Sequence, residues 1–184
     1  LDTNVRPYPT ARGNHLFISA ALYLRDKVPL DKIERIVCDV GYRYRHSALP
    51  LEARARPTNV PDAKYGIPFA VGFALARGKV SLNNLNESAL QDKEALRLAS
   101  LIEISLQKQG EDRKGNITIH YKGGSVESPR VGLAALTMEQ VREKFLDCCE
   151  FAKLGSRGTA YYDKLMVLEK ADISKLMSEI TVSA

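Results

Sequence analysis

The amino-acid sequence predicts an α+β fold, in which a small antiparallel sheet packs with helices. Three segments alternate apolar with polar residues, at 36–40, 102–106 and 117–121, which is the period of a half-buried strand. Before and after these segments, apolar residues recur mostly at the spacing of a helix, so helices and strands are segregated along the chain. The 184 residues, 45% of them hydrophobic, suffice for one domain with a buried core over residues 1–184.

The N-terminal third predicts one helix, one strand and one loop. The run His15–Leu24 is mostly apolar and follows Asn14, a suitable N-cap, so we expect a buried helix there. The strand at 36–40 ends at Gly41. Residues 41–61 carry three prolines and many charges, which predicts a long loop.

The middle of the chain predicts two more helices. One runs from Asp62 to Arg77, or begins near Ile67 if the proline that follows disrupts its first turns. Gly78 suits the left-handed position at its end. A capping-box pattern at 88–91 predicts a third helix over residues 89–97.

The C-terminal half predicts a hairpin followed by helices. Gly123-Gly124 is a two-residue turn signal after the third alternating segment, and it leads into a short strand. Thr137–Gln140 is a second capping box, and the helix that it opens ends at Gly155. Two further helices are expected, at 159–170 and 172–181, the last with Asp172 as its N-cap.

The net charge of +5 is concentrated near the N-terminus, where residues 1–57 hold ten basic and six acidic residues. A basic surface attracts nucleic acid or acidic metabolites. Charge elsewhere is balanced, so we expect a small anionic partner and no nucleic acid. No run of about 18 apolar residues occurs, which argues against a membrane-spanning helix. Four arginines crowd around His46: Arg43, Arg45, Arg54 and Arg56.

The spacing of the cysteines and the absence of standard sequence motifs argue against a metal site or a cofactor site. Cys38, Cys148 and Cys149 lack metal-ligand spacing and fit reduced thiols of a cytoplasmic protein. The phosphate-binding loop, the dinucleotide glycine fingerprint and the zinc-binding His-Glu motif are absent. We therefore predict no metal and no cofactor. The N-terminus has no initiator methionine and no signal-peptide pattern, so we expect a piece of a longer chain.

The first candidate site is the polar lead-in to the first helix. Two prolines stiffen the run from Arg6 to Asn14, and Gly13 lets the backbone turn into the helix at His15. A carboxylate substrate suits this segment, because it combines the amides of a helix start with Arg6, Arg12 and His15. A rigid turn with a capping histidine fits the same residues.

The second candidate site is the segment Asp62–Phe69. It places the cation of Lys64 and the hydroxyl of Tyr65 at a helix start, which again favours an anion. The same spacing fits a plain helix N-terminus, with Lys64 in solvent and Phe69 in the core.

Taken in order, the two segments carry a resemblance. Arg6-x-Tyr8-Pro9 followed by His15 is similar to the Lys-x-Tyr-Pro…His segment of the MmgE/PrpD family. Lys64-Tyr65-Gly66-Ile67-Pro68-Phe69 is similar to the Lys-Phe-Ser-x-Pro-Tyr segment of that family. A strand with a glutamate, a Gly-Gly hairpin and a Lys-Phe helix follow in the family order, so the resemblance spans essentially the whole chain.

The resemblance implies the C-terminal α+β domain of a two-domain protein, with the active site in a cleft against a helical N-terminal domain. That partner domain is expected outside this chain, and the whole protein is expected to be a homodimer. The family includes 2-methylcitrate dehydratase, cis-aconitate decarboxylase and an iminodisuccinate epimerase. His15 matches the histidine lining the cleft. Arg6 stands where many members have a substrate-binding lysine, and Phe69 where several have an active-site tyrosine.

The activity implied by the resemblance is that of a metal-independent lyase. It would act on a di- or tricarboxylate by α-proton abstraction and elimination, and the isolated domain would be inactive. His15 is the expected catalytic residue, and Arg6, Arg12, Lys64 and Phe69 are expected to bind substrate. An epimerase or isomerase, a decarboxylase and a non-catalytic binding domain are the alternatives.

Overall fold

A computed structural model describes residues 5–110, 115–130, 135–170 and 173–180 of the chain. The chain divides into two compact units, and each is described by itself. One unit is Arg6–Ala135, and the other comprises Leu136–Ala184 with the first five residues.

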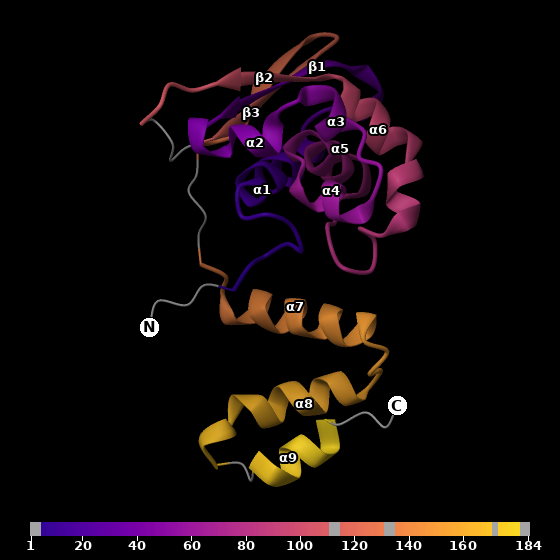
Figure 1. Cartoon of the computed structure of the whole chain (residues 1–184), viewed down its shortest axis with the longest axis vertical. Coiled ribbons are helices and arrows are strands. Elements are labelled where there is room, and N and C mark those ends of the chain that lie inside the picture. Colours follow the sequence, from indigo (N-terminus) through magenta and orange to yellow (C-terminus); the bar gives the residue numbers. More distant parts are fainter. Residues whose placement is uncertain (1–4, 111–114, 131–134, 171–172, 181–184) are drawn as a thin grey trace. The chain divides into compact units, whose positions relative to one another are not determined.

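The larger unit holds four strands and the helices that pack against them (Figure 1). The combination of helices with a sheet confirms the predicted α+β class. In chain order, with η for a 3-10 helix, its elements are α1 (Asn14–Arg25), η1 (Leu30–Lys32), β1 (Ile33–Val40), η2 (Tyr42–Tyr44), α2 (Arg45–Ala48), α3 (Leu51–Ala55), α4 (Val60–Tyr65), α5 (Ile67–Arg77), η3 (Glu87–Gln91), α6 (Lys93–Ser100), β2 (Ile102–Leu106), β3 (Asn116–Tyr121) and β4 (Gly124–Glu127).

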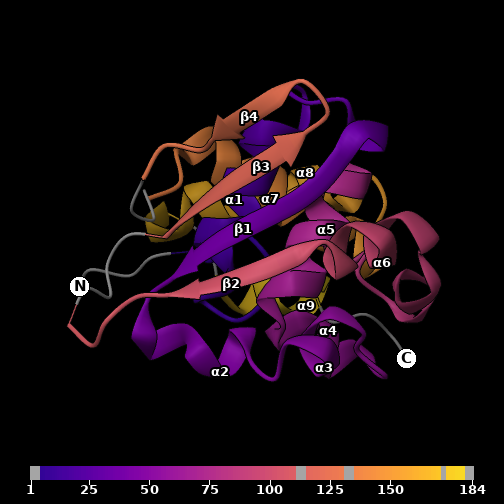
Figure 2. The same cartoon turned by 90° about the horizontal axis from the view of Figure 1, so that it is seen from above.

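The strands lie in the order β2-β1-β3-β4, as Figure 2 shows. β1 pairs antiparallel with β3, and β3 pairs antiparallel with β4 across the predicted Gly-Gly hairpin. The sheet is therefore mostly antiparallel, as predicted, and its one parallel pair among the described strands is β1 with β2. The chain between them contains η2 through α6, a long helical connection of the kind that parallel neighbours require.

One face of the sheet is apolar and lies against α1, which in turn packs on α5 (Figure 1). Ile36 of β1 pairs with Ile102 on one side and with Ile119 on the other. All three side chains are buried, and so is Cys38, two residues after Ile36 on the same face of β1. Burial of alternate residues on β1 and β3 explains why the sequence there alternates apolar with polar residues, whereas β2 buries only Ile102.

The predicted loop at 41–61 is mostly helical. It contains η2, α2, α3 and the start of α4, of which the longest has six residues. Helices of one turn or little more cannot display the repeating apolar stripe by which longer helices are recognised. The prediction of a long loop is therefore wrong for this segment.

Two helix starts differ from the sequence-based predictions, and a third matches the alternative given for it. α1 begins at Asn14 itself, with Gly13 in the N-cap position. The helix expected from residue 62 starts instead at Ile67, which confirms the alternative start. Gly66, whose backbone is extended, ends α4 and begins α5. The capping-box pattern at 88–91 forms only η3, and α6 starts later, after Asp92.

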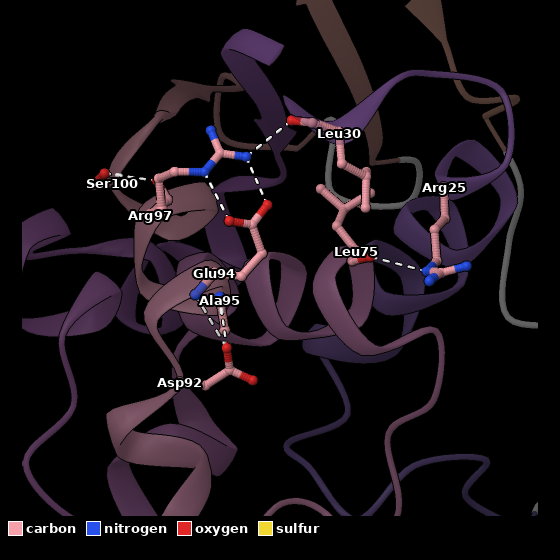
Figure 3. Close-up of polar contacts among 8 residues, drawn as sticks. All are labelled: Arg25, Leu30, Leu75, Asp92, Glu94, Ala95, Arg97 and Ser100. Carbon is pink, nitrogen blue, oxygen red and sulfur yellow. Dashed lines mark hydrogen bonds and ion pairs between the residues drawn. The ribbon is translucent and has the colours of Figure 1, made fainter. Parts of the chain in front are cut away.

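Polar contacts fix α6 and α5 to their neighbours (Figure 3). The carboxylate of Asp92 accepts hydrogen bonds from two backbone amides at the start of α6, both at 3.1 Å. Arg97 donates to Glu94 and to the carbonyl oxygen of Leu30, at 2.9 Å in each case. Arg25, at the end of α1, donates to a carbonyl oxygen near the end of α5, at 3.0 Å. These bonds hold the helices around the core in a fixed register.

The smaller unit consists of helices in its described part. They are α7 (Met138–Phe151), α8 (Arg157–Met166), η4 (Leu168–Lys170) and α9 (Ile173–Ile180). The capping box that Thr137 and Gln140 were predicted to form is present. α8 begins two residues earlier than predicted and ends before η4, and the predicted cap Asp172 lies outside the described residues. Gly158 lets α8 approach α7, since a β-carbon there would lie 2.7 Å from that of Cys149.

None of the helices in the described ranges combines the length and the apolar content that crossing a membrane requires.

Candidate functional site

The lead-in to α1 surrounds His15 with polar backbone and one aromatic ring. The imidazole is 1% exposed, and its Nε2 lies 3.2 Å from the carbonyl oxygen of Thr10. A carbonyl oxygen only accepts, so Nε2 carries the proton of this bond. The ring of Tyr8 packs edge-on against the imidazole, with centroids 5.7 Å apart and planes at 85°. The Tyr8 hydroxyl is in turn 3.2 Å from the hydroxyl of Ser19. The side chain of His15 is thus held in one orientation.

The carbonyl oxygen of Lys64 joins the two candidate segments. It accepts a hydrogen bond from the backbone N–H of Ala11 at 2.9 Å and another from the side-chain amide of Asn14 at 3.2 Å. Asn14 is fully buried, so the second bond is shielded from water. The lead-in to α1 and the end of α4, about fifty residues apart in sequence, therefore form one local structure.

Two glycines bring the basic segment against this structure. A β-carbon on Gly13 would lie 2.5 Å from the ring of Tyr44, and one on Gly66 would lie 2.8 Å from the carbonyl oxygen of Arg54. Both distances are shorter than a β-carbon tolerates, so only glycine allows these approaches. The segment with the four arginines therefore adjoins both candidate segments.

The predicted site residues differ widely in exposure. Arg6 and Arg12 are exposed, Lys64 is half-buried and His15 is buried. Phe69 is fully buried in α5 and stacks on Phe73, with ring centroids 5.9 Å apart. Phe69 is thus a core residue, as its spacing also allowed, and its contact with substrate stays a prediction.

Three polar atoms near this structure were not singled out from the sequence. Oγ1 of Thr10, Oδ1 of Asn14 and Nε of Arg54 are buried, and none has a hydrogen-bond partner among the described residues. Buried polar atoms without partners are rare in folded proteins and often mark sites. Thr10 and Asn14 lie inside the run that was chosen from the sequence, but nothing in the sequence separates Arg54 from its neighbouring arginines.

The acidic, cysteine and histidine side chains of the described residues form no group of three that could hold a metal ion. Burial raises the pKa of the Cys38 thiol to about 12, so this cysteine is protonated at neutral pH. Burial, together with the adjacent thiol of Cys148, also raises the pKa of Cys149. The two candidate segments offer an imidazole, guanidinium groups, the ammonium group of Lys64 and backbone amides.

A model of a known protein family matches most of the chain. No curated protein sequence matches the chain. The family model described as the MmgE/PrpD C-terminal domain matches residues 8–159, which include His15, the turn at Lys64–Gly66, the whole sheet and α7. The resemblance seen in the two sequence segments is thereby confirmed at the level of the family. The chain belongs to the MmgE/PrpD family and corresponds to its C-terminal domain.

Proposed function

We propose that this chain forms one wall of the active site of a carbon–oxygen lyase that resembles 2-methylcitrate dehydratase. Membership of a family that includes lyases and dehydratases supports the proposal. The structural observation that carries it is the Lys64 carbonyl oxygen, which ties the cationic lead-in of α1 to the segment that starts α5. A wall built in this way offers several cations and helix-start amides to one organic acid.

In the proposed reaction a proton leaves the carbon next to a substrate carboxylate, hydroxide leaves the neighbouring carbon, and a carbon–carbon double bond forms. Arg6, Arg12 and Lys64 hold carboxylates and stabilise the enolate-like charge. His15 transfers the proton or positions the group that does so. Its Nε2 donates to the carbonyl oxygen of Thr10, which fixes the orientation of the ring. Phe69 supports the same wall from the core.

General acid–base catalysis of this kind contributes about 10²–10⁴ in rate. The remaining acceleration needs groups from elsewhere, and we assign these to a helical N-terminal domain within a cytoplasmic homodimer. The 184-residue chain on its own is therefore expected to fold without turning over substrate. Measurable elimination by this chain alone would contradict that expectation.

The test is a turnover assay on the full-length protein with 2-methylcitrate and citrate in heavy water. Ultraviolet absorbance detects a new conjugated double bond, and mass spectrometry detects deuterium at the α-carbon. Elimination supports the proposal. Deuterium exchange without elimination points to an epimerase, and carbon dioxide release from an unsaturated acid points to a decarboxylase. Binding without any of these reactions points to a non-catalytic domain.

A further inference from the structure

The side chain of Arg54 is half-buried, and its Nε atom is buried. This atom differs from Nε of two other arginines that pack at helix ends of the larger unit. Nε of Arg25 donates to the carbonyl oxygen of Leu75 at 3.0 Å. Nε of Arg97 donates to the carboxylate of Glu94 at 2.9 Å, and Figure 3 shows both bonds. Nε of Arg54 is withdrawn from water, yet none of the described residues accepts its hydrogen.

Nearby acidic residues do not explain this donor. Between residues 42 and 66 the chain has two carboxylates, those of Glu52 and Asp62. Asp62 accepts a hydrogen bond from the side chain of Asn59 at 2.8 Å, and neither carboxylate forms an ion pair with Arg54 in the described structure. A guanidinium group that is partly withdrawn from water is costly unless an acceptor satisfies it. The structure therefore provides a cationic donor without supplying its acceptor.

The position of Arg54 connects it to the candidate site. Its carbonyl oxygen touches the backbone at Gly66, as the close approach at that glycine shows. Gly66 follows Lys64 by two residues, and the Lys64 carbonyl oxygen binds the lead-in to α1. The backbone of Arg54 thus adjoins the turn that binds the lead-in to α1, although α3 was expected to be part of a loop.

Two unpartnered acceptors lie in that structure as well. Thr10 and Asn14 are 6% and 0% exposed, and Oγ1 of the first and Oδ1 of the second lack partners among the described residues. A ligand that satisfies all three atoms needs an anionic acceptor for Arg54 and a hydrogen-bond donor for Asn14. A carboxylate and a hydroxyl group on one small molecule meet both requirements.

We propose that Arg54 is a carboxylate-binding residue of this site, acting beside Asn14 and Thr10 on a hydroxycarboxylate. This inference rests on the proposed function only in taking the ligand to be an organic acid. Arginine suits the role because its planar fork binds a carboxylate through two parallel hydrogen bonds, which lysine cannot do. Arg54 therefore sets which carboxylate of a substrate faces the turn between α4 and α5.

The experiment measures citrate binding by calorimetry to the full-length protein and to its variants Arg54→Gln and Arg56→Gln. Both variants lose one positive charge from the same segment, but Arg56 is exposed. We expect the citrate Kd to rise about tenfold or more in Arg54→Gln, as for the loss of a hydrogen bond to a charged group, and to change little in Arg56→Gln. An equal rise in both variants would mean diffuse charge attraction and would overturn the inference.

A second measurement needs no stable glutamine variant. In ¹⁵N-labelled wild-type protein, the Nε–H resonance of Arg54 is assigned by its loss from the spectrum of Arg54→Lys. We expect citrate to shift this resonance more than that of Arg56. An unmoved Arg54 resonance at saturating citrate, or no citrate binding at all, overturns the inference.

The two proposals fail separately. Turnover of 2-methylcitrate with unchanged KM in Arg54→Gln would remove Arg54 from the site and leave the lyase intact. Arg54-dependent citrate binding without turnover of any tested acid would support the role of Arg54 and reject the lyase.

Discussion

The side-chain amide of Asn14 donates a hydrogen bond to the carbonyl oxygen of Lys64, 3.2 Å away and fifty residues further along the chain. Replacing Asn14 with alanine removes this donor from a fully buried position. We expect the free energy of unfolding to fall by about 1–3 kcal/mol, the usual cost of breaking a buried hydrogen bond. Urea denaturation measures the change. The exposed Gln91→Ala serves as the control, and an equal effect of both substitutions would argue against a structural tie at Lys64.

Gly72 provides a second, independent test of the packing. It lies inside α5, where a β-carbon would approach the backbone carbonyl oxygen of Ala95 in α6 to 2.5 Å. The neighbouring helix must move to admit alanine, so we expect Gly72→Ala to destabilise the fold by about 1–3 kcal/mol. Gly124→Ala is the matched control, because its nearest contact would be an ordinary 3.6 Å. A Tm of Gly72→Ala equal to that of the control would show that α5 and α6 are less closely packed.

Asp92 should make stability depend on pH. Burial alone raises the pKa of this carboxylate, but hydrogen bonds from Arg77 and from the amides of Ala95 and Glu94 outweigh burial, so the pKa lies below its ordinary value. A lowered pKa in the folded state means that the stabilisation is complete above the unfolded value, near 3.8, and is lost as the pH falls through the folded pKa. We expect Asp92→Ala to cost about 0.5–2 kcal/mol near neutral pH, as for loss of an N-cap.

The variant Asp92→Asn distinguishes the contribution of the negative charge to stability from the contribution of the N-cap. Asparagine is also a good N-cap, so this variant should be more stable than Asp92→Ala at neutral pH. Its difference from the wild type should shrink on acidification, because the wild-type carboxylate then becomes neutral too. Thermal unfolding across a pH series measures this. A difference that stays constant down to the most acidic pH at which the protein folds would rule out the charge contribution.

Short-range signals in the sequence predicted much of this fold. The capping box at Thr137 needs residues only three positions apart, and Gly78 adopts the left-handed backbone (φ 67°) that was expected at the end of α5. The strands were predicted because successive side chains of a strand point to opposite faces of the sheet, so apolar and polar residues alternate. Such features are encoded within a few residues, although the capping-box pattern at 88–91 formed only η3.

Features that depend on distant partners were missed. Asn14 is a helix residue and not a cap, and its amide bonds to Lys64, a partner that no local pattern reveals. β1 pairs in parallel with β2. Predicting this pairing requires knowing at which edge of the sheet the chain re-enters after a connection of more than sixty residues. Arg54 is distinguished from Arg56 only by burial, since the two are alike in sequence context. The two candidate segments were therefore predictable, but the hydrogen bonds that link them through the Lys64 carbonyl oxygen were not.

The three cysteines should react in a fixed order. Cys38 is fully buried with a pKa of about 12, and the pKa of Cys149 is raised as well, whereas Cys148 is half-buried. Because the thiolate is the reactive form, iodoacetamide should label Cys148 first in the native protein. We expect Cys38 to be labelled only as fast as the larger unit opens. Mass spectrometry follows each site, and urea-unfolded protein, in which all three react alike, is the control. Native labelling of Cys38 at the rate of Cys148 would contradict its burial.

His15→Gln is the sharpest test of catalysis, because glutamine can keep the donor to the Thr10 carbonyl oxygen while removing the group that exchanges protons. Alanine is less suitable, since a buried residue replaced by alanine leaves a cavity and lowers stability by itself. We expect kcat of the full-length protein to fall about 10²–10⁴-fold, with a small change in Tm. His120→Gln, on β3 at 3.2 Å from Arg35, is the matched control and should leave kcat unchanged. If His15→Gln retains wild-type kcat, the imidazole serves only to hold the start of α1, and the base must come from another part of the protein.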